Sequence, residues 1–203
     1  APSLGPLPLG GTPRVVGTVT EEATFRRLAD GEPVPCDVVE IRLDQLGTDL
    51  AGWQDACRRI GERVAPVLLT LRHAREGGAW DGPEAERRAL LRDALPLARA
   101  IDTEISLAGV TDLARAPGRG DTVVIGSFHD FDRTPAAEDL DAVVQSGLQQ
   151  GADVVKLACF VHDEEDEDRL LALVGRHPGA KLSVLGMGPR GGHTRIRFPC
   201  QGS

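Results

Sequence analysis

Two short β-branched runs, at residues 123–125 and 154–155, limit the possible folds more than any other part of the sequence. Such runs are typical of buried strands. Between them, five small or apolar residues recur with the i, i+3, i+4, i+7, i+8 spacing of one helix face: Leu140, Val143, Val144, Gly147 and Leu148. The segment therefore predicts a strand–helix–strand unit, whose right-handed crossover lays the two strands parallel and close together.

Each of these predicted strands leads to an ionisable side chain, His129 after the first run and Lys156 at the end of the second. Parallel α/β folds keep their chemistry at the C-terminal edge of the sheet, where both side chains are expected. Taken singly, a lysine that closes a strand is usually a surface residue, and a histidine followed by an aspartate is usually a loop residue. As a neighbouring pair, they indicate amine catalysis on a carbonyl compound.

The rest of the chain repeats the same alternation of strand and helix. Five further strands are expected, at residues 14–20, 36–43, 65–72, 100–107 and 180–185. Helical periodicity separates them, and no change in composition divides the chain. We therefore expect one domain over residues 14–203, preceded by a flexible Pro/Gly-rich arm at residues 1–13.

Repeated βα units are typical of either a (β/α) barrel or a doubly wound sheet, and periodicity does not separate the two. A full eight-unit barrel needs about 250 residues, although compact ones are shorter, and this chain has 203. In the predicted strand at residues 36–43, Glu40 and Arg42 alternate with apolar residues, and Asp44 follows. Charges near several strand ends favour the barrel, because a barrel gathers every strand end around one mouth.

Charge and composition narrow the range of partners. The net charge of −8 comes from 31 acidic and 23 basic residues, which argues against a general binder of nucleic acid or acidic membranes. The sequence contains no apolar run of membrane-spanning length. Four widely separated cysteines form no metal-ligand motif, so we expect reduced thiols and, without an export signal, a cytoplasmic protein.

Seven short motifs then follow one another in order. They are EIRLD at 40–44, TLR at 70–72, EGG at 76–78, DTE at 102–104, SFHDF at 127–131 with TP at 134–135, DVVK at 153–156 and MG at 187–188. Each motif alone is weakly specific, whereas the ordered series is specific. Over residues 14–203 the chain resembles the type I 3-dehydroquinate dehydratases, the Schiff-base enzymes of the shikimate pathway of aromatic amino-acid biosynthesis.

The resemblance implies a (β/α)8 barrel that needs no metal or cofactor. It implies a reaction in which a lysine forms an imine with the C3 ketone of 3-dehydroquinate, followed by loss of water to give 3-dehydroshikimate. By motif position, Lys156 resembles the imine-forming lysine, His129 the general acid/base and Glu76 the carboxylate that orients the histidine. The substrate-binding residues implied are Glu40, Arg42 and Arg72 for the ring hydroxyls and Arg195 for the carboxylate.

Elementary chemistry agrees with this assignment. A protonated imine withdraws electrons as a neighbouring proton leaves, and so divides one difficult step into two. Histidine titrates in the range needed to carry that proton near neutral pH. Purely structural roles remain open for four of these residues. Glu40 and Arg42 could form an ion pair at the barrel mouth, Arg195 could be a surface charge, and Glu104 could be a structural carboxylate of the barrel.

The sequence departs from the family pattern near its C-terminus. The resemblance implies an eighth strand, a loop with substrate-binding Ser and Gln residues, and a closing helix, none of which follows Gly202-Ser203. Thr194 stands where the family pattern has a serine. Seven strands leave two open sheet edges, which the N-terminal arm, a second subunit or a smaller closure could cover; a homodimer is our preferred expectation. The alternatives to a working dehydratase are a degenerate relative that binds a related ligand or partner, and another lysine-imine lyase of the class I aldolase type.

Overall fold

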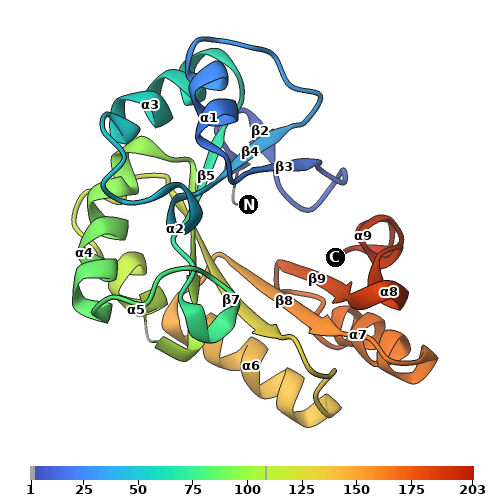
Figure 1. Ribbon diagram of the computed structural model, residues 1–203. Coiled ribbons are helices and arrows are strands. Elements are labelled where there is room, and N and C mark those ends of the chain that lie inside the picture. The colour runs from blue at the N-terminus through green and yellow to red at the C-terminus, as the bar shows by residue number, and fades with distance from the viewer. Residues whose placement is uncertain (1–2, 108) are drawn as a thin grey trace.

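The computed structural model describes residues 3–107 and 109–203, and its centre is a curled sheet of seven parallel strands (Figure 1). The neighbours in this sheet follow the chain order without reversal. The strands are β3 (Val16–Val19), β4 (Val38–Arg42), β5 (Val67–Thr70), β6 (Ala100–Glu104), β7 (Val123–Asp130), β8 (Val154–Phe160) and β9 (Leu182–Met187). A doubly wound sheet would reverse its strand order, so the strand order selects the barrel-type fold.

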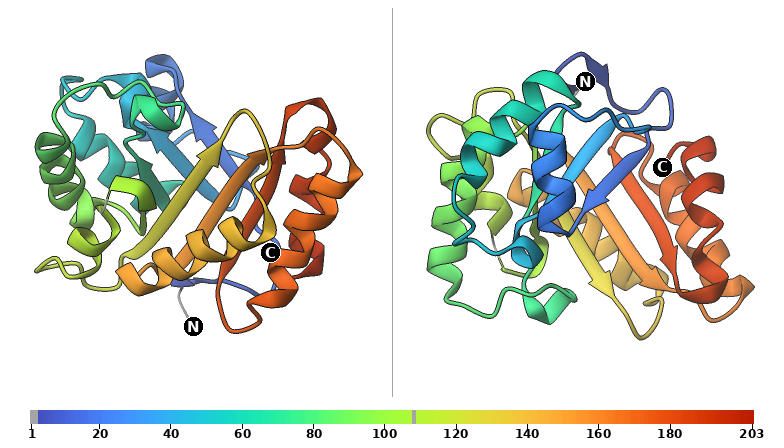
Figure 2. Two further views of the ribbon diagram at one scale, coloured as in Figure 1. Left: turned by 90° about the horizontal axis from the view of Figure 1, so that it is seen from below. Right: turned by 45° about the horizontal axis from the view of Figure 1, so that its top comes forward.

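Helices connect successive strands and lie on the outer, convex face of the sheet (Figure 2). The longer ones are α1 (Glu22–Ala29), α3 (Trp53–Arg63), α4 (Glu84–Ala94), α5 (Gly109–Ala114), α6 (Ala137–Gln150) and α7 (Glu164–Arg176). The shorter ones are α2 (Leu43–Leu46), α8 (Gly188–Gly191), α9 (Thr194–Arg197) and the 3₁₀ turns η1 (Ala74–Glu76), η2 (Leu95–Leu97), η3 (Ile105–Leu107) and η4 (Pro199–Gln201). None of the described helices combines the length and apolar character needed to cross a membrane.

The main hydrophobic core lies between the sheet and these helices. Along each strand, alternate side chains such as Ile41 and Leu69 point outward into it and are fully buried. On the helix side, Leu140, Val144 and Gly147 of α6 are buried, as the helical spacing predicted, whereas Leu148 of the same predicted face is 39% exposed near the end of the helix. The remaining strand positions therefore face the interior of the curl, where polar side chains gather.

The predicted strand–helix–strand unit is confirmed. Strands β7 and β8 pair in parallel, with Ser127 opposite Lys156 and His129 opposite Ala158. Paired residues share a face of the sheet, so Lys156 and His129 project from the same face of adjacent strands. One detail differs: β8 continues past Lys156 to Phe160, because Leu157 and Cys159 keep alternate positions buried in the core. Lys156 therefore lies within its strand rather than at the end.

The barrel is open on one side, as expected from seven strands. Strands β3 and β9 are the two edges of the sheet (Figure 1). Near the β3 edge, Val15 and Val16 are 59% and 47% exposed, and Ile196 on α9 is 76% exposed. The β3 edge thus leaves two apolar side chains, Val15 and Val16, exposed.

Residues 3–8 differ from the expected flexible arm. Ser3–Leu4 and Leu7–Pro8 form a two-stranded antiparallel hairpin, β1 and β2. Leu4 is buried in a cluster with the first or second residues of five strands, namely Val38, Leu68, Ala100, Val123 and Val154. The hairpin therefore covers the N-terminal floor of the barrel, opposite the end where polar side chains are expected. Composition missed it because two leucines among prolines and glycines give no measurable periodicity.

Candidate active site

Lys156 projects from β8 into the interior of the curl and is held there by a carboxylate. Its Nζ lies 3.0 Å from Oδ2 of Asp102 on β6. The lysine side chain is 21% exposed, whereas the Asp102 side chain is completely buried. The amine is thus partly exposed, and the negative charge of Asp102 holds it in place.

The charge of Asp102 is stabilised from several directions. Arg72 Nη2 donates to Oδ1 at 2.9 Å, and the Ser127 hydroxyl donates to the same oxygen at 2.5 Å. Burial by itself would raise the pKa of Asp102, but Arg72, Lys156 and the Ser127 hydrogen bond hold that pKa well below its ordinary value. Asp102 is therefore a carboxylate at every pH at which the protein is expected to work.

A chain of buried charges continues from Asp102 to the outer helices. Arg72, which is 4% exposed, also contacts the Glu104 carboxylate at 3.4 Å, and Glu104 forms an ion pair with Arg87 on α4 at 2.6 Å. Arg87 is fully buried and donates to the Leu71 carbonyl oxygen as well. Positive and negative groups alternate along this line, which compensates the cost of burying them. Glu104 thus lies between two buried arginines, as expected for a structural carboxylate of the barrel.

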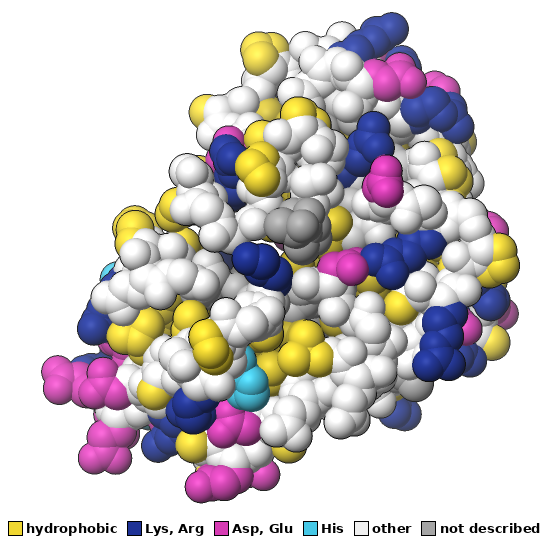
Figure 3. Space-filling model, turned by 180° about the vertical axis from the view of Figure 1, so that it is seen from behind, with side chains coloured by type: hydrophobic (Ala, Val, Ile, Leu, Met, Phe, Trp, Pro, Cys, Tyr) yellow, Lys and Arg dark blue, Asp and Glu magenta, His cyan; other side chains and the backbone are white. Residues whose placement is uncertain are grey.

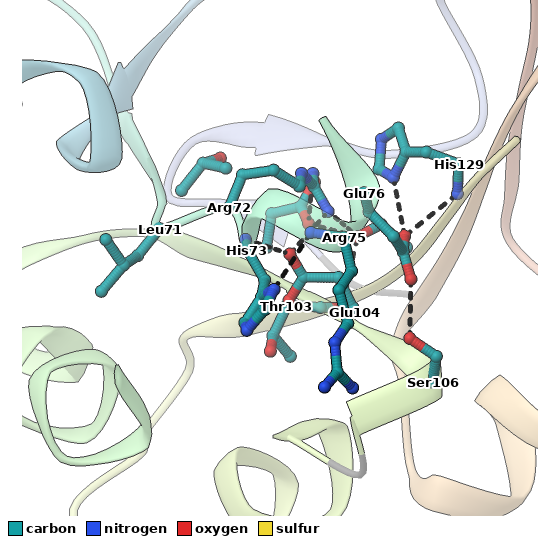
Figure 4. A network of polar contacts seen from close by, with 12 residues as sticks. Leu71, Arg72, His73, Arg75, Glu76, Thr103, Glu104, Ser106 and His129 are labelled. Carbon is teal, nitrogen blue, oxygen red and sulfur yellow. Dashed lines mark hydrogen bonds and ion pairs between the residues drawn. The ribbon is translucent and has the colours of Figure 1, made fainter. Parts of the chain in front are cut away.

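His129 lies near the C-terminal end of β7 and is paired with Glu76. Its Nδ1 lies 3.1 Å from Glu76 Oε2, and its backbone N–H donates to the same oxygen at 3.1 Å (Figure 4). Both side chains are about nine-tenths buried. The contact assigns the proton to Nδ1 and leaves the Nε2 lone pair free, the form that a general base requires.

The surroundings of His129 favour its neutral form. Burial lowers its pKa, the Glu76 hydrogen bond raises it, and the cations Arg72 and Lys156 lower it further, for a net pKa below the ordinary value. The Phe131 ring stacks near the imidazole, with 6.3 Å between ring centroids. At neutral pH the imidazole is therefore uncharged and able to accept a proton.

Glu76 reaches His129 because the loop after β5 folds tightly. His73 ring Nδ1 accepts from the Arg75 backbone N–H at the start of η1, and Gly77 follows with a positive φ of 75°. Gly78 then passes so close to Arg72 that a Cβ there would lie 1.9 Å from the Arg72 carbonyl oxygen. This position therefore requires glycine, which explains the second glycine of the EGG motif.

Glu40 and Arg42 face the interior from β4, but each has separate partners. Glu40 accepts from the hydroxyls of Thr18 and Thr70 on the flanking strands, at 2.8 Å each. Arg42 instead makes two hydrogen bonds to Asp44, at 2.9 and 2.7 Å. They do not form the ion pair with each other that was one interpretation of the sequence.

Arg195 stands apart from the other candidate residues. It lies on α9 with an exposed side chain and, among the described residues, forms no ion pair with the groups around Lys156. Its neighbour Thr194 is buried; its hydroxyl accepts from the Gly186 N–H at 2.8 Å and donates to the Gly191 carbonyl oxygen at 2.6 Å. Thr194 thereby attaches the segment that follows β9, which includes Gly191, to the strand itself.

Three polar residues of this site were not assigned from the sequence: Asp102, Ser127 and Ser106, whose hydroxyl donates to Glu76 Oε1 at 2.6 Å. Asp102 and Ser127 lie within the recognised motifs, and their inward positions follow from strand alternation once the lumen face is known. Ser106 lies on η3, outside every motif, so the sequence carried no signal for it.

Comparison with known proteins agrees with this geometry. The family model described as Type I 3-dehydroquinase matches residues 15–203. The chain is 38% identical to the 3-dehydroquinate dehydratase of Methanosarcina barkeri over 177 residues, covering 82% of this chain and 73% of the relative. It is 34% identical to the 3-dehydroquinate dehydratase of Methanocella arvoryzae over 194 residues, covering 94% and 84%.

Solved structures give the same result. The crystal structure of 3-dehydroquinate dehydratase from Geobacillus kaustophilus superposes with a TM-score of 0.83 at 26% identity, covering 96% of this chain and 81% of that one. The enzyme from Enterococcus faecalis gives a TM-score of 0.84 at 24% identity, covering 100% and 91%, and supports the fold. The ordered motifs, the barrel-type strand order and the family match together place this chain in the type I 3-dehydroquinase family.

Proposed function

We propose that this protein is a 3-dehydroquinate dehydratase, a hydro-lyase that converts 3-dehydroquinate to 3-dehydroshikimate and water through a lysine imine. The observation that carries the proposal is the placement of Lys156 and His129 on one face of the paired strands β7 and β8. An amine and a neutral base on one face fit an elimination next to a ketone.

The proposed reaction assigns each step to a group of this chain. Lys156 Nζ attacks the C3 carbonyl carbon, and loss of water gives a protonated imine whose positive charge Asp102 stabilises. His129 Nε2 removes a C2 proton, and the C2–H electrons enter the iminium to form an enamine. The enamine then expels the C1 hydroxyl, which takes the proton from His129 and leaves as water. Hydrolysis of the remaining imine releases the product and restores Lys156.

The roles of the surrounding residues follow from their contacts. Glu76 orients His129 through Nδ1. Glu40 and Arg42 lie on the inner face of β4 and supply an acceptor and a donor for ring hydroxyls. Arg72 is saturated by Asp102, Glu104 and Ser127, so in this proposal it contacts the substrate with its outer edge while ordering Asp102. Arg195, exposed on α9, is the residue that we propose binds the substrate carboxylate.

We also propose that the protein acts as a homodimer in the cytoplasm on a small-molecule substrate. The exposed apolar residues of the open side support a second copy as the cover for this edge. All four cysteines are free thiols, which fits a reducing compartment. On the face in Figure 3, side chains of both charges are interspersed, which, with a net charge of −8, supports a small ligand rather than a nucleic acid.

A turnover assay tests the proposal. Purified protein and 3-dehydroquinate should produce the ultraviolet absorbance of the conjugated enone, and Lys156→Ala should lower kcat by at least about 10³-fold. Lys181→Ala is the matched control, because Lys181 is a lysine at the opposite, N-terminal end of β9.

Substrate binding without turnover in the unaltered protein would instead favour the degenerate binding protein, which the open barrel side makes a specific alternative. Retro-aldol cleavage without dehydration would favour the aldolase-type lyase.

A further inference from the structure

The Glu76 carboxylate has two oxygens with different tasks. Oε2 accepts both the backbone N–H and the Nδ1 proton of His129, at 3.1 Å each. Oε1 accepts from the Ser106 hydroxyl at 2.6 Å, and among the described residues Ser106 is the one hydrogen-bond partner of that oxygen (Figure 4). The carboxylate is therefore held at one end by the residue it orients and at the other end by Ser106.

We infer that Ser106 is a positioning residue for the proposed dehydratase reaction, fixing the Glu76 carboxylate so that Oε2 faces Nδ1 of His129. This inference rests on the proposed function, since it concerns the same base. Ser106 is far from Glu76 in sequence, and it reaches the carboxylate from η3, directly after β6. It acts on His129 only through Glu76.

The need for such a group follows from the freedom of a glutamate side chain. Its terminal torsion is broad, and Glu76 lies on a short 3₁₀ turn between β5 and α4 rather than in a long helix. With a single anchor, the carboxylate could rotate and present either oxygen, or neither, to the imidazole. A short hydroxyl–carboxylate bond at Oε1 restricts that rotation, since bonds to an ionised acceptor are stronger than neutral ones.

The charged groups around His129 allow the effect to be measured. Glu76 faces it from the β5–α4 loop, Arg72 from the end of β5, Lys156 from β8 and Asp102 from β6. Within this set, the Glu76 hydrogen bond and the Asp102 charge raise the pKa of His129, while both cations lower it. If Ser106 holds Glu76 in place, removing its hydroxyl weakens the Glu76 contact, and the pKa of His129 falls.

The chain offers a conservative variant and a matched control. Ser106→Thr keeps the hydroxyl at an exposed position with room for a methyl group. Ser146→Ala removes a different hydroxyl, which accepts from Gln150 at 3.1 Å, while Gln150 also donates to the Ile105 carbonyl oxygen on η3. This control loosens the support of η3 without touching Glu76.

The test combines kinetics with a titration of His129 followed by NMR in ¹⁵N-histidine-labelled, full-length protein. Ser106→Ala should lower kcat about fivefold at the pH plateau, the value of one hydrogen bond. KM should change less than twofold, and the His129 pKa should fall with loss of the single Nδ1–H tautomer. Ser106→Thr and Ser146→Ala should match the unaltered protein in both measurements.

Three results would overturn the inference: Ser106→Ala with unchanged kcat and unchanged His129 titration, a rise in the His129 pKa, or an equal loss in Ser106→Thr. Failure of the proposed function would look different. In that case the unaltered protein would lack turnover, while the NMR titration, which needs no substrate, would still decide whether Ser106 controls His129.

Discussion

At the scale of single residues, the candidate site holds one charged and one neutral titratable side chain, each influencing the pKa of the other. Asp102 is buried among cations and stays ionised, whereas His129 is buried beside cations and stays neutral. In the proposed reaction, the charge of Asp102 stabilises a positive imine, and the neutral His129 acts as the base. Both pKa values are lowered, which leaves the carboxylate charged and the imidazole neutral, and perturbed pKa values of this kind cluster at acid/base sites.

The pH profile of kcat/KM should reflect the neutral state of His129. The base must be neutral, so the rate should fall with decreasing pH as His129 becomes protonated. Because its pKa is lowered from 6.5, the acid limb should lie below pH 6.5. Glu76→Gln removes the contact that raises this pKa, so its acid limb should move to still lower pH, with a reduced plateau. An acid limb above pH 6.5 in the unaltered protein would contradict the assignment.

Asp102→Asn should be strongly destabilising. The substitution leaves Arg72 and Lys156 without their shared anion in a buried position, and breaking buried pairs in this way costs about 3–5 kcal/mol. Urea unfolding followed by circular dichroism measures the loss. Arg26→Ala, in the exposed Glu22–Arg26 pair with both side chains over half exposed, should change the free energy of unfolding by less than about 1 kcal/mol. Equal effects from the two substitutions would contradict this account of the buried network.

At the scale of elements, the loop between β5 and α4 carries the orienting carboxylate and depends on a close backbone approach at Gly78. Gly78→Ala should displace this loop, because a Cβ would meet the Arg72 carbonyl oxygen at 1.9 Å. Displacement of Glu76 by about 1 Å should lower kcat about 10- to 100-fold. An unchanged kcat would show that the loop does not set the geometry of His129.

Gly61→Ala is the matched control for this glycine. Gly61 is exposed in the last turn of α3, and its added Cβ would make an ordinary 3.8 Å contact with Val67. This substitution should leave kcat unchanged and stabilise the protein by about 0.5–1 kcal/mol, the difference in helix propensity between alanine and glycine.

The order of strands and helices could largely be predicted from the sequence. The hydrogen-bond and ion-pair partners of individual side chains could not be predicted as well. The β-branched residues at the start of Val123–Asp130 and Val154–Phe160 predict these two strands. The spacing of Leu140 and Val144 predicts the buried face of the helix between them. Helix starts are harder to read from sequence, since α4 follows Pro83 and has no side-chain cap. Helix α7 has such a cap, because Asp163 accepts from the Asp166 N–H.

The candidate site shows where sequence reasoning stops. Motif order identified Lys156, His129 and Glu76, and the structure places the last two in contact. Asp102 was not assigned because its contact with Lys156 spans β6, β7 and β8 and depends on strand register. Ser106 depends on the path of a 3₁₀ turn, which no periodicity encodes. Arg195 is named by its motif, but its exposed position on α9 depends on elements beyond local sequence.

At the scale of the whole molecule, the open side of the barrel is the main feature to be explained. β3 and β9 are the two edges of the sheet. On β9 the Ser203 hydroxyl bonds to the Val184 backbone N–H and carbonyl oxygen, whereas Val16 on β3 is 47% exposed. If a second copy covers this edge, Val16→Lys should convert a dimer to a monomer, because a charge would be buried at the contact. Light scattering after size-exclusion chromatography measures the mass. A monomeric unaltered protein would contradict the proposed homodimer.

The most direct test of the proposed chemistry is the covalent step at Lys156. The protein is incubated with 3-dehydroquinate, the imine is reduced with borohydride, and the modified peptide is identified by mass spectrometry. The account predicts a stable adduct on Lys156 that is absent from Lys156→Ala, together with enone formation in the unreduced reaction. Enone formation with no adduct on Lys156, or an adduct on another lysine, would contradict it.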